Sequence, residues 1–298
     1  MTRLSSPWLF ALVVAIWGTT WHAIVYQLQH SSPEFGVGLR FGLAGGLVLA
    51  WAAWRGDSLR VPLRAHGLLA LQGVFMYSLS YLCVYHAERH VPSGLVAVGY
   101  SASPLLAGLG AWALWRTPLT ARFLLGGALG VGGVALIFWP ELSATASSHA
   151  AARGLGFTVA AVLLSAVGAL AASRNSRWSL AFWPALGWGL LYGCLASAVA
   201  LALSGQPLVW PTAVSWWLSL AYLAVAGTVV AFGGFLTLQQ RLGPGKAATV
   251  GVMTPVLALA VSTALEGFRP DAYTAAGAAL AILGNVLMLR RDAVRATA

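Results

Sequence analysis

Tyrosines at helical spacing are the side chains of this sequence that most readily suggest chemistry. Tyr77, Tyr81 and Tyr85 follow one another every four residues, so a helix places them along one stripe. A phenol inside an apolar run needs a hydrogen-bond partner, and its ring can stack on a flat apolar group. Tyr77 and Tyr81 therefore fit either the aromatic wall of a binding cavity or a packed contact between helices. We expect Tyr85, near the end of its apolar run, at the membrane interface.

Other aromatic and apolar side chains could extend such a wall. Trp17 and Trp21 share a helix face by the same spacing. Each of the two could line a cavity or pack between helices, and for Trp21 we favour the packed position. Phe232 and Met253 would add adaptable apolar surface, which suits loose selectivity. Taken singly, each of these two residues also fits an ordinary core position.

Two prolines predict free backbone carbonyls. Pro104 and Pro255 each lie within an apolar run, and a proline in a helix leaves the carbonyl four residues back without its N–H partner. Those carbonyls belong to Tyr100 and Gly251. A substrate ammonium could bind to them, or a water or a neighbouring helix could satisfy them. We therefore expect both helices to be interrupted, and Tyr100 and Gly251 to line the site.

A few polar side chains within the apolar runs could also contact a substrate. Ser80 and Ser101 could bond it directly, although serine in such a helix often bonds its own backbone. His22 could relay protons, but we favour a neutral histidine held by structural hydrogen bonds. Arg40 could attract a substrate carboxylate, but we expect it to reach the outer interface or to bond loop carbonyls.

Membrane spans are the elements that must carry these residues. The chain has 298 residues, 59% of them hydrophobic and only 8% charged, and its mean hydropathy is +0.79. A soluble domain carries about 25% charged residues, so we predict an all-α integral membrane protein. The first apolar run has no convincing cleavage site and is interpreted as a span. At about 20 residues a helix, ten spans are predicted: 7–26, 34–54, 66–86, 92–114, 120–139, 154–174, 179–203, 213–238, 245–265 and 272–290.

Lysine and arginine indicate the orientation. If the N-terminus is cytoplasmic, outer loops hold only Arg89, Arg153 and Arg269. Inner segments then hold Arg3, Arg55, Arg60, Arg64, Arg116, Arg122, Arg174, Arg177, Arg241, Lys246, Arg290, Arg291 and Arg295. Basic residues concentrate on the cytoplasmic side of membrane proteins, so we predict that both termini are cytoplasmic. The net charge of +10 is therefore interpreted as a topology signal and not as a sign of nucleic-acid binding.

The two halves of the chain resemble each other. A shift of 151 residues aligns, among others, Pro104 with Pro255, Gly126 with Gly277 and Gly133 with Gly284. Each half holds five predicted spans, an odd number, so the second half enters the membrane from the opposite side. We therefore predict two inverted repeats, residues 1–145 and 152–298, around a central cavity. Inverted repeats with interrupted helices are the usual frame for alternating access.

An ordered set of short motifs runs through nearly the whole chain. It comprises Trp17-Gly18, Arg40-Phe41, the run from Ala87 to Pro104, the run from Gln240 to Pro244, Thr254-Pro255, Glu266, and the run from Gly277 to Gly284. With these motifs the sequence resembles the drug/metabolite transporter superfamily, EamA type. Its tyrosine- and tryptophan-rich middle is most similar to the YddG-type exporters of aromatic amino acids. The resemblance implies ten helices, a central cavity lined by helices one, three, four, six, eight and nine, and export of small metabolites.

One position departs from the pattern of that family. The family often has an acidic residue after the fourth span, where this chain has Trp115-Arg116-Thr117-Pro118. The counterpart in the second half, Glu266, is present. The resemblance therefore does not imply a symmetric role for this acid in the two halves.

Together these features predict a bacterial inner-membrane transporter that exports amino acids by alternating access, with aromatic and bulky neutral ones favoured. Its partners would be the small-molecule substrate and the lipid bilayer, as monomer or dimer, and we expect no cofactor and no metal. The seven acidic residues lie near span ends or in loops. Because proton-coupled carriers commonly keep a carboxylate within the membrane, we expect transport without obligatory ion coupling.

Other functions fit the sequence less well. Export of aromatic cationic drugs is the nearest alternative, since aromatic rings attract cations. Nucleotide-sugar transport would need several cavity cations for the diphosphate, and only Arg40 and Lys246 are available. A membrane-embedded enzyme would need a Ser/His pair, two buried carboxylates or clustered metal ligands. A channel would not need two inverted halves with central breaks.

Overall fold

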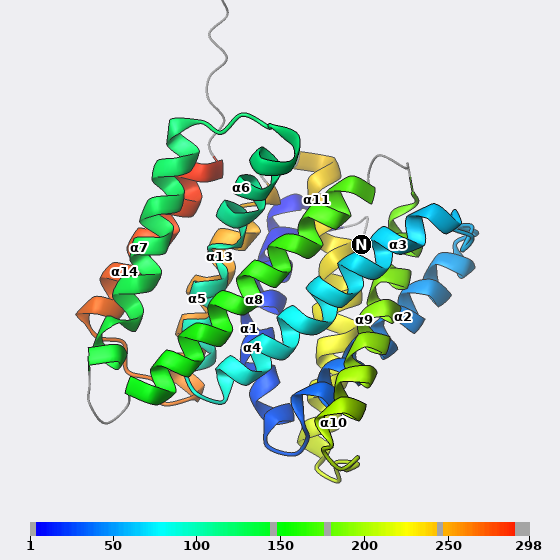
Figure 1. The fold of residues 1–298 in the computed structure, drawn as a ribbon, viewed down its shortest axis with the longest axis horizontal. Coiled ribbons are helices and arrows are strands. Elements are labelled where there is room, and N and C mark those ends of the chain that lie inside the picture. Colours follow the sequence, from blue (N-terminus) through cyan, green and yellow to red (C-terminus); the bar gives the residue numbers. More distant parts are fainter. Residues whose placement is uncertain (1–3, 144–147, 176–179, 243–246, 290–298) are drawn as a thin grey trace, which may run out of the picture.

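Helices form the whole of the ordered architecture in the described part of the chain (Figure 1). The computed structural model describes residues 4–143, 148–175, 180–242 and 247–289. The first half contains α1 (Ser6–Leu28), α2 (Pro33–Trp54), α3 (Leu63–Gln72), the π-helical η1 (Gly73–Leu79), α4 (Ser80–Glu88), α5 (Ser93–Tyr100), α6 (Ser103–Trp115) and α7 (Ala121–Ser143). The second half contains α8 (Ser148–Asn175), α9 (Phe182–Ser204), α10 (Val214–Ala221), the π-helical η3 (Tyr222–Val230), α11 (Ala231–Leu242), α13 (Val250–Leu265) and α14 (Ala272–Leu289).

Nine helical segments in the described ranges are long and apolar enough to cross a membrane. Three of them join consecutive elements into one span each, namely α3 to α4, α5 to α6, and α10 to α11. The predicted span 245–265 contains α13, which is equally apolar but shorter. The all-helical membrane fold predicted from the sequence is therefore confirmed. Some predicted positions lie outside the described residues: 179, 245, 290, Arg3, Arg177, Lys246, Arg291 and Arg295.

Polar turns determine where two of these helices begin. The Ser32 hydroxyl accepts a hydrogen bond from the backbone N–H of Phe35 (3.3 Å), and Pro33 occupies the first turn of α2. Proline is tolerated there because the first N–H groups of a helix have no partner within it. In the same way, the Asp271 carboxylate accepts a hydrogen bond from the N–H of Thr274 (2.7 Å) at the start of α14. Both caps lie where the chain turns back into the bundle.

The packing of α7 on α14 shows the symmetry between the two halves. These last helices of each half lie side by side at one edge of the bundle (Figure 1). A Cβ on Gly126 would clash with the carbonyl of Gly284, and a Cβ on Gly133 would clash with that of Gly277. The 151-residue shift places Gly126 on Gly277 and Gly133 on Gly284, so the two contacts are equivalent. A twofold axis between antiparallel helices requires this equivalence. This arrangement supports the predicted inverted repeat.

The two proline-containing spans differ in structure. α5 ends at Tyr100 and α6 begins at Ser103 with Pro104 in its first turn, so this span is interrupted beside its proline. Pro255 instead lies inside the continuous α13, and the turn in that span is at residues 248–249. The prediction that Pro255 interrupts its helix is therefore wrong. The carbonyl that Pro255 leaves without an N–H is that of Gly251, at the second residue of α13, and the helix continues past it.

A second pair of irregularities was not predicted from the sequence. η1 and η3 are π-helical stretches within the third and eighth spans. Shifted by 151 residues, 73–79 falls on 224–230, which lies within η3, so both halves carry the irregularity at the same place. π turns inside α-helices occur frequently at functional sites, because they rearrange the local hydrogen bonding. The third and eighth spans can therefore bend at equivalent positions.

The two ends of the bundle are packed to different degrees. α5 and α6 are successive halves of one span, yet α5 buries seven of its eight residues whereas α6 buries none. α5 starts at the end of the bundle where Glu266 follows α13, and we call this the Glu266 end. α6 ends at Trp115, and we call the opposite end of the bundle the Trp115 end. The bundle is closed at the Glu266 end and looser around α6.

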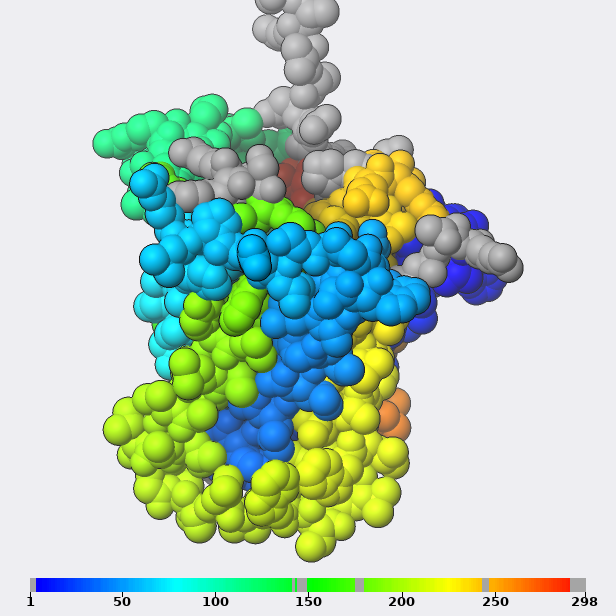
Figure 2. Space-filling view, turned by 90° about the vertical axis from the view of Figure 1, so that its right-hand side faces the viewer, coloured from blue at the N-terminus to red at the C-terminus, as the bar shows by residue number. Residues whose placement is uncertain are grey.

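A groove of about 690 Å³ runs down one side of the bundle between α2, α9 and α10. Figure 2 shows the blue surface of α2 recessed between yellow-green surfaces. The walls are almost entirely apolar and include Gly38, Gly42, Leu43, Cys194 and Trp217. Leu43 itself is exposed. We interpret the groove as part of the surface that faces lipid.

The contact between α7 and α14 gives a direct test of the fold. Replacing Gly133 with leucine should lower the free energy of unfolding by about 1–3 kcal/mol, because overpacking a tight contact forces the backbones apart. Gly132→Leu is the matched control, since nothing lies within 4 Å of a Cβ at Gly132. Thermal unfolding in detergent should therefore distinguish the two variants, and equal losses of stability would contradict the packing described here.

Candidate functional site

Aromatic side chains from both halves of the chain meet in the middle of the bundle. Trp17 of α1 lies edge-on to Phe232 of α11, with ring centroids 5.4 Å apart. Trp21, one turn further along α1, lies edge-on to Tyr100 at the end of α5, with ring centroids 5.6 Å apart. The predicted aromatic residues of the first, fourth and eighth spans are therefore neighbours in space.

The tyrosine stripe of the third span faces α2. Phe41 of α2 contacts both Tyr77 and Tyr81, with ring centroids 5.6 and 4.8 Å away. The guanidinium of Arg40 lies over the ring of Tyr81, with its Cζ atom 4.8 Å from the centroid. A cation in this position is attracted by the face of the ring. Tyr85 is fully buried and donates a hydrogen bond to Gln27 Oε1 (2.6 Å). The expectation that it lies at the membrane interface is therefore wrong, because it packs between helices.

Two of the predicted site residues, Tyr77 and Ser80, are buried and hydrogen-bonded to other parts of the protein. Tyr77 is only 4% exposed, and its hydroxyl accepts a hydrogen bond from Gln72 Nε2 (3.1 Å). Ser80 is fully buried and donates to the carbonyl of Ala161 (2.8 Å) while its oxygen also lies 3.1 Å from the Tyr100 hydroxyl. Tyr77 and Ser80 therefore support the site from behind and do not form its surface.

Five side chains stay partly exposed although they pack against buried core residues. We call them the aromatic cluster: Trp17, Trp21, Tyr81, Tyr100 and Phe232. Trp17 is held in place by a hydrogen bond from its indole N–H to the carbonyl of Gly227 (3.1 Å), at the π-helical η3. The cluster thus combines ordered ring positions with accessible ring faces, which is the arrangement that binding a flat apolar group requires.

Two predicted site residues of α13 take different positions. Met253 is 44% exposed and shares a stripe with exposed Ala260, whereas the stripe through Ala258 and Ser262 packs against α5. Met253 is therefore not part of the packed core, and its place in the site stays a prediction. Gly251 lies on the α5-facing stripe and is exposed, with open space where a Cβ would stand.

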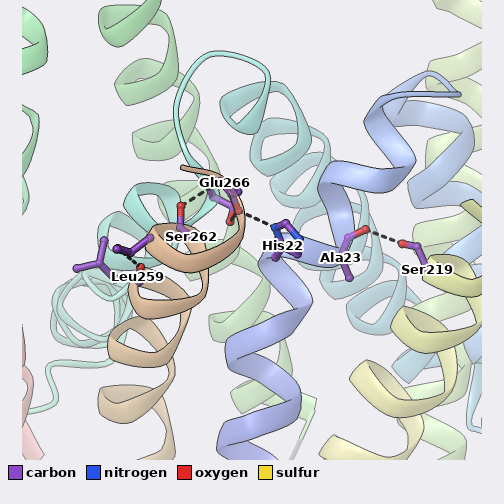
Figure 3. Close-up of polar contacts among 8 residues, drawn as sticks. His22, Ala23, Ser219, Leu259, Ser262 and Glu266 are labelled. Carbon is purple, nitrogen blue, oxygen red and sulfur yellow. Dashed lines mark hydrogen bonds and ion pairs between the residues drawn. The ribbon is translucent and has the colours of Figure 1, made fainter. Parts of the chain in front are cut away.

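His22 belongs to a polar cluster at the Glu266 end and not to the aromatic cluster (Figure 3). Its Nδ1 lies 3.0 Å from Glu266 Oε1, and Figure 3 shows it pointing from α1 toward the end of α13. The Glu266 carboxylate also accepts hydrogen bonds from the backbone N–H of Ser93 (3.0 Å), from the Ser93 hydroxyl and from the Ser262 hydroxyl (3.0 Å). These contacts tie α1, α5 and α13 together and close this end.

The hydrogen bonds also set the charge state of Glu266. Burial alone would raise the pKa of this carboxyl group, but the hydrogen bonds from Ser93, His22 and Ser262 together hold the pKa below its ordinary value of 4.5. Glu266 is therefore ionised near neutral pH. In the sequence, only the family resemblance singles out Glu266. The spacing of four residues between Ser262 and Glu266, which places both on one helix face, is the local feature that could have indicated their contact.

Arg40 does not reach the membrane interface. Its side chain is buried, with the residue only 3% exposed, so the expectation that it snorkels outward is wrong. Tertiary packing decides this, because α2 presents Arg40 to Tyr81 of α4 and not to lipid. A second charged group, Glu88 at the end of α4, has both carboxylate oxygens buried. In the described ranges no three His, Cys, Asp or Glu side chains gather as metal ligands.

Comparison with known proteins shows which protein family and which relatives this chain is similar to. A family model described as the EamA-like transporter family matches residues 5–139 and 152–290. A protein of Escherichia coli (strain K12) named "Uncharacterized inner membrane transporter YedA" is 28% identical over 268 residues, covering 87% of this chain and 82% of that protein. A second protein of that strain, named "Probable amino-acid metabolite efflux pump", is 29% identical over 301 residues, covering 95% and 96%.

A solved structure shares the fold. It is described as "Crystal structure of protein", has a TM-score of 0.67 and 20% sequence identity, and matches 95% of this chain and 96% of its own. A similarity at this level of identity supports the helical arrangement alone.

The hydrogen bonds of Glu266 with His22, Ser93 and Ser262, which we call the Glu266 cluster, predict that the stability of the fold depends on pH. Because the folded state holds the Glu266 pKa below 4.5, the ionised carboxylate stabilises the fold above that pH, and this contribution is lost as the pH falls through the lowered pKa. Glu266→Gln should therefore lower the melting temperature at neutral pH and flatten its decline in acid. Thermal unfolding in detergent measures this, with Asp57→Asn on the exposed loop as control. A Glu266→Gln curve parallel to that of the parent would contradict it.

Proposed function

Since the chain belongs to the EamA-like transporter family, we propose that it exports amino acids, with aromatic and bulky neutral ones favoured. The observation that carries this proposal is the aromatic cluster, to which both halves contribute partly exposed rings. Rings in these positions can take up a flat apolar side chain by stacking and by burying its surface. The similarity to proteins named probable amino-acid metabolite efflux pumps supports the same substrate class.

Transport would proceed by alternating access between the two ends of the bundle. In this proposal the repeats, residues 1–145 and 152–298, move against each other, and η1 and η3 provide bending points at equivalent positions. The Glu266 cluster holds one end closed, whereas α6 at the other end is loosely packed. This difference in packing supports opening at the Trp115 end as one step of the proposed cycle.

The proposed location is the inner membrane of a bacterium, with both termini cytoplasmic. A relative is named an inner membrane transporter, and the basic residues of this chain concentrate in the loops of one side. The Trp115 end is then cytoplasmic, which is where an exporter takes up its substrate. Monomer and dimer are both compatible with this proposal, and neither a cofactor nor nucleic acid takes part in it.

Export of aromatic cationic drugs is the second candidate. The faces of Trp17, Trp21 and Tyr100 would attract a flat cation as readily as a neutral ring. Membership of a transporter family makes a carrier the leading class, ahead of an enzyme or a channel. Saturable counterflow distinguishes a carrier from a channel, and the choice of labelled substrate distinguishes the two cargo classes.

Tyr81 offers the most direct test of the aromatic cluster. Tyr81→Ala removes a ring contact that contributes on the order of 2 kcal/mol, so the KM for labelled phenylalanine in proteoliposome counterflow should rise about tenfold or more. Tyr273→Ala is the matched control, because Tyr273 is exposed on α14. Equal KM values for Tyr81→Ala and the parent would contradict the site. Exchange of aromatic cations without any exchange of phenylalanine would favour drug export.

The coupling mode is tested separately. We propose that substrate flows down its own gradient without obligatory ion coupling. Phenylalanine counterflow should then be unaffected by a pH gradient imposed across the proteoliposome membrane. An ionophore that collapses the gradient serves as control. Concentrative uptake of phenylalanine that the pH gradient drives, and that the ionophore abolishes, would contradict this proposal.

A further inference from the structure

Arg40 is a buried cation whose hydrogen-bonding groups are incompletely used. Within the described ranges, its Nε and Nη1 atoms are buried and have no hydrogen-bond partner. The guanidinium stacks over Tyr81, which is a partly exposed member of the aromatic cluster. Removing a charged group from water is expensive unless it is paired and hydrogen-bonded. Arg40 therefore presents free donors directly beside the candidate site.

Glu88 is a buried carboxyl group in a similar situation. In the described part of the chain, neither of its carboxylate oxygens has a hydrogen-bond partner, although both are buried. Tyr81, Tyr85 and Glu88 are spaced by four and three residues along α4, so they share one face. Helical side chains lean toward the N-terminus of their helix, and Glu88 therefore leans back toward Tyr85 and the ring beneath Arg40.

The two charges attract each other without forming a direct ion pair. Arg40 and Glu88 interact electrostatically, but no ion pair joins them among the described residues. The nearby carboxylate of Glu266 is already bound by His22 and Ser93 and does not pair with Arg40. Gln27 adds another unused donor, because its Nε2 is buried without a partner while its Oε1 binds Tyr85. A guanidinium, a carboxyl group and an amide thus each keep buried hydrogen-bonding atoms without a partner in the described part of the chain.

We propose that Arg40 and Glu88 bind the charged groups of an α-amino acid, with Arg40 holding the carboxylate and Glu88 the ammonium. The side chain of the amino acid then lies on Tyr81 and the rest of the aromatic cluster. This inference rests on the proposed function and adds to it the recognition of both charges. A planar guanidinium suits a carboxylate because it can donate two parallel hydrogen bonds.

The pair also discriminates between the two candidate cargoes. An aromatic cation would meet Glu88 but leave the donors of Arg40 unpaired, and an aromatic acid would do the reverse. A site with buried polar groups rejects a ligand that leaves one of them unpaired more strongly than it rejects a change in apolar size. Only a ligand that carries both charges satisfies both Arg40 and Glu88, which favours a zwitterionic amino acid.

Three compounds that share one ring isolate the two charges. Phenylalanine has both charged groups, phenethylamine lacks the carboxylate and 3-phenylpropionate lacks the ammonium. Exchange of each against labelled phenylalanine is measured in proteoliposomes that contain the full-length protein. The parent should prefer phenylalanine over both analogues by about tenfold or more, the value of one charge-assisted hydrogen bond. A parent that accepts either analogue as well as phenylalanine contradicts the paired-charge site while leaving amino-acid transport intact.

Single substitutions assign each charge. Arg40→Gln should lose the preference for phenylalanine over phenethylamine, and Glu88→Gln should lose the preference over 3-phenylpropionate. Arg89→Gln, at the exposed residue next to Glu88, is the matched control and should keep both preferences. Preferences are ratios measured within one preparation, so they do not depend on how much of a variant folds. Arg40→Lys, which keeps the charge, provides a second variant if Arg40→Gln does not fold, and it should retain part of the preference.

Several results would overturn the proposal. Arg40→Gln and Glu88→Gln variants that slow all three compounds by the same factor would show that the charges act only on the structure. Variants that keep the parental preferences would show that the charges do not contact the substrate. A parent that exchanges no amino acid but does exchange phenethylamine would overturn the proposed function together with this site.

Discussion

The cost of burying charge in a membrane bundle is the constraint on which this structure depends. A charged or polar group that is buried between membrane helices needs a partner within the protein or a water-filled cavity. Glu266 meets this requirement with hydrogen bonds from His22, Ser93 and Ser262, and by doing so it joins helices of both halves. Arg40 and Glu88 lie deep in the same end but keep unused hydrogen-bonding atoms. One set of charges thus holds the fold, and the other is available for a ligand.

The two ends of the bundle differ because only one of them has a hydrogen-bonded carboxylate that joins the helices. The repeat shift of 151 residues places Trp115 opposite Glu266 and Ala111 opposite Ser262, so the carboxylate that closes one end has no equivalent at the other. This asymmetry agrees with a fully packed α5 and an α6 without buried residues. In the proposed orientation the looser end faces the cytoplasm, the compartment from which the proposed exporter takes up its substrate.

The sequence was sufficient for features that depend on composition and spacing. Apolar runs predicted the spans, and helical spacing singled out Trp17, Trp21 and Tyr81. The 151-residue shift aligned the glycines of α7 and α14, and the structure shows that these glycines contact each other reciprocally. Features that depend on neighbouring helices could not be predicted. His22 and Glu266 lie 244 residues apart in the sequence, so nothing local indicates their contact. The contact of Arg40 with α4 is also tertiary, and without it the sequence predicted that Arg40 reaches the membrane interface. The π-helical stretches have no characteristic residue pattern.

The most direct test of the account is a structure of the protein with phenylalanine bound, determined by electron cryomicroscopy in lipid nanodiscs. We predict that the carboxylate lies against Arg40, the ammonium against Glu88 and the ring on Tyr81. Phenylalanine in another place, such as the apolar groove between α2 and α9, would contradict the account even if transport were observed.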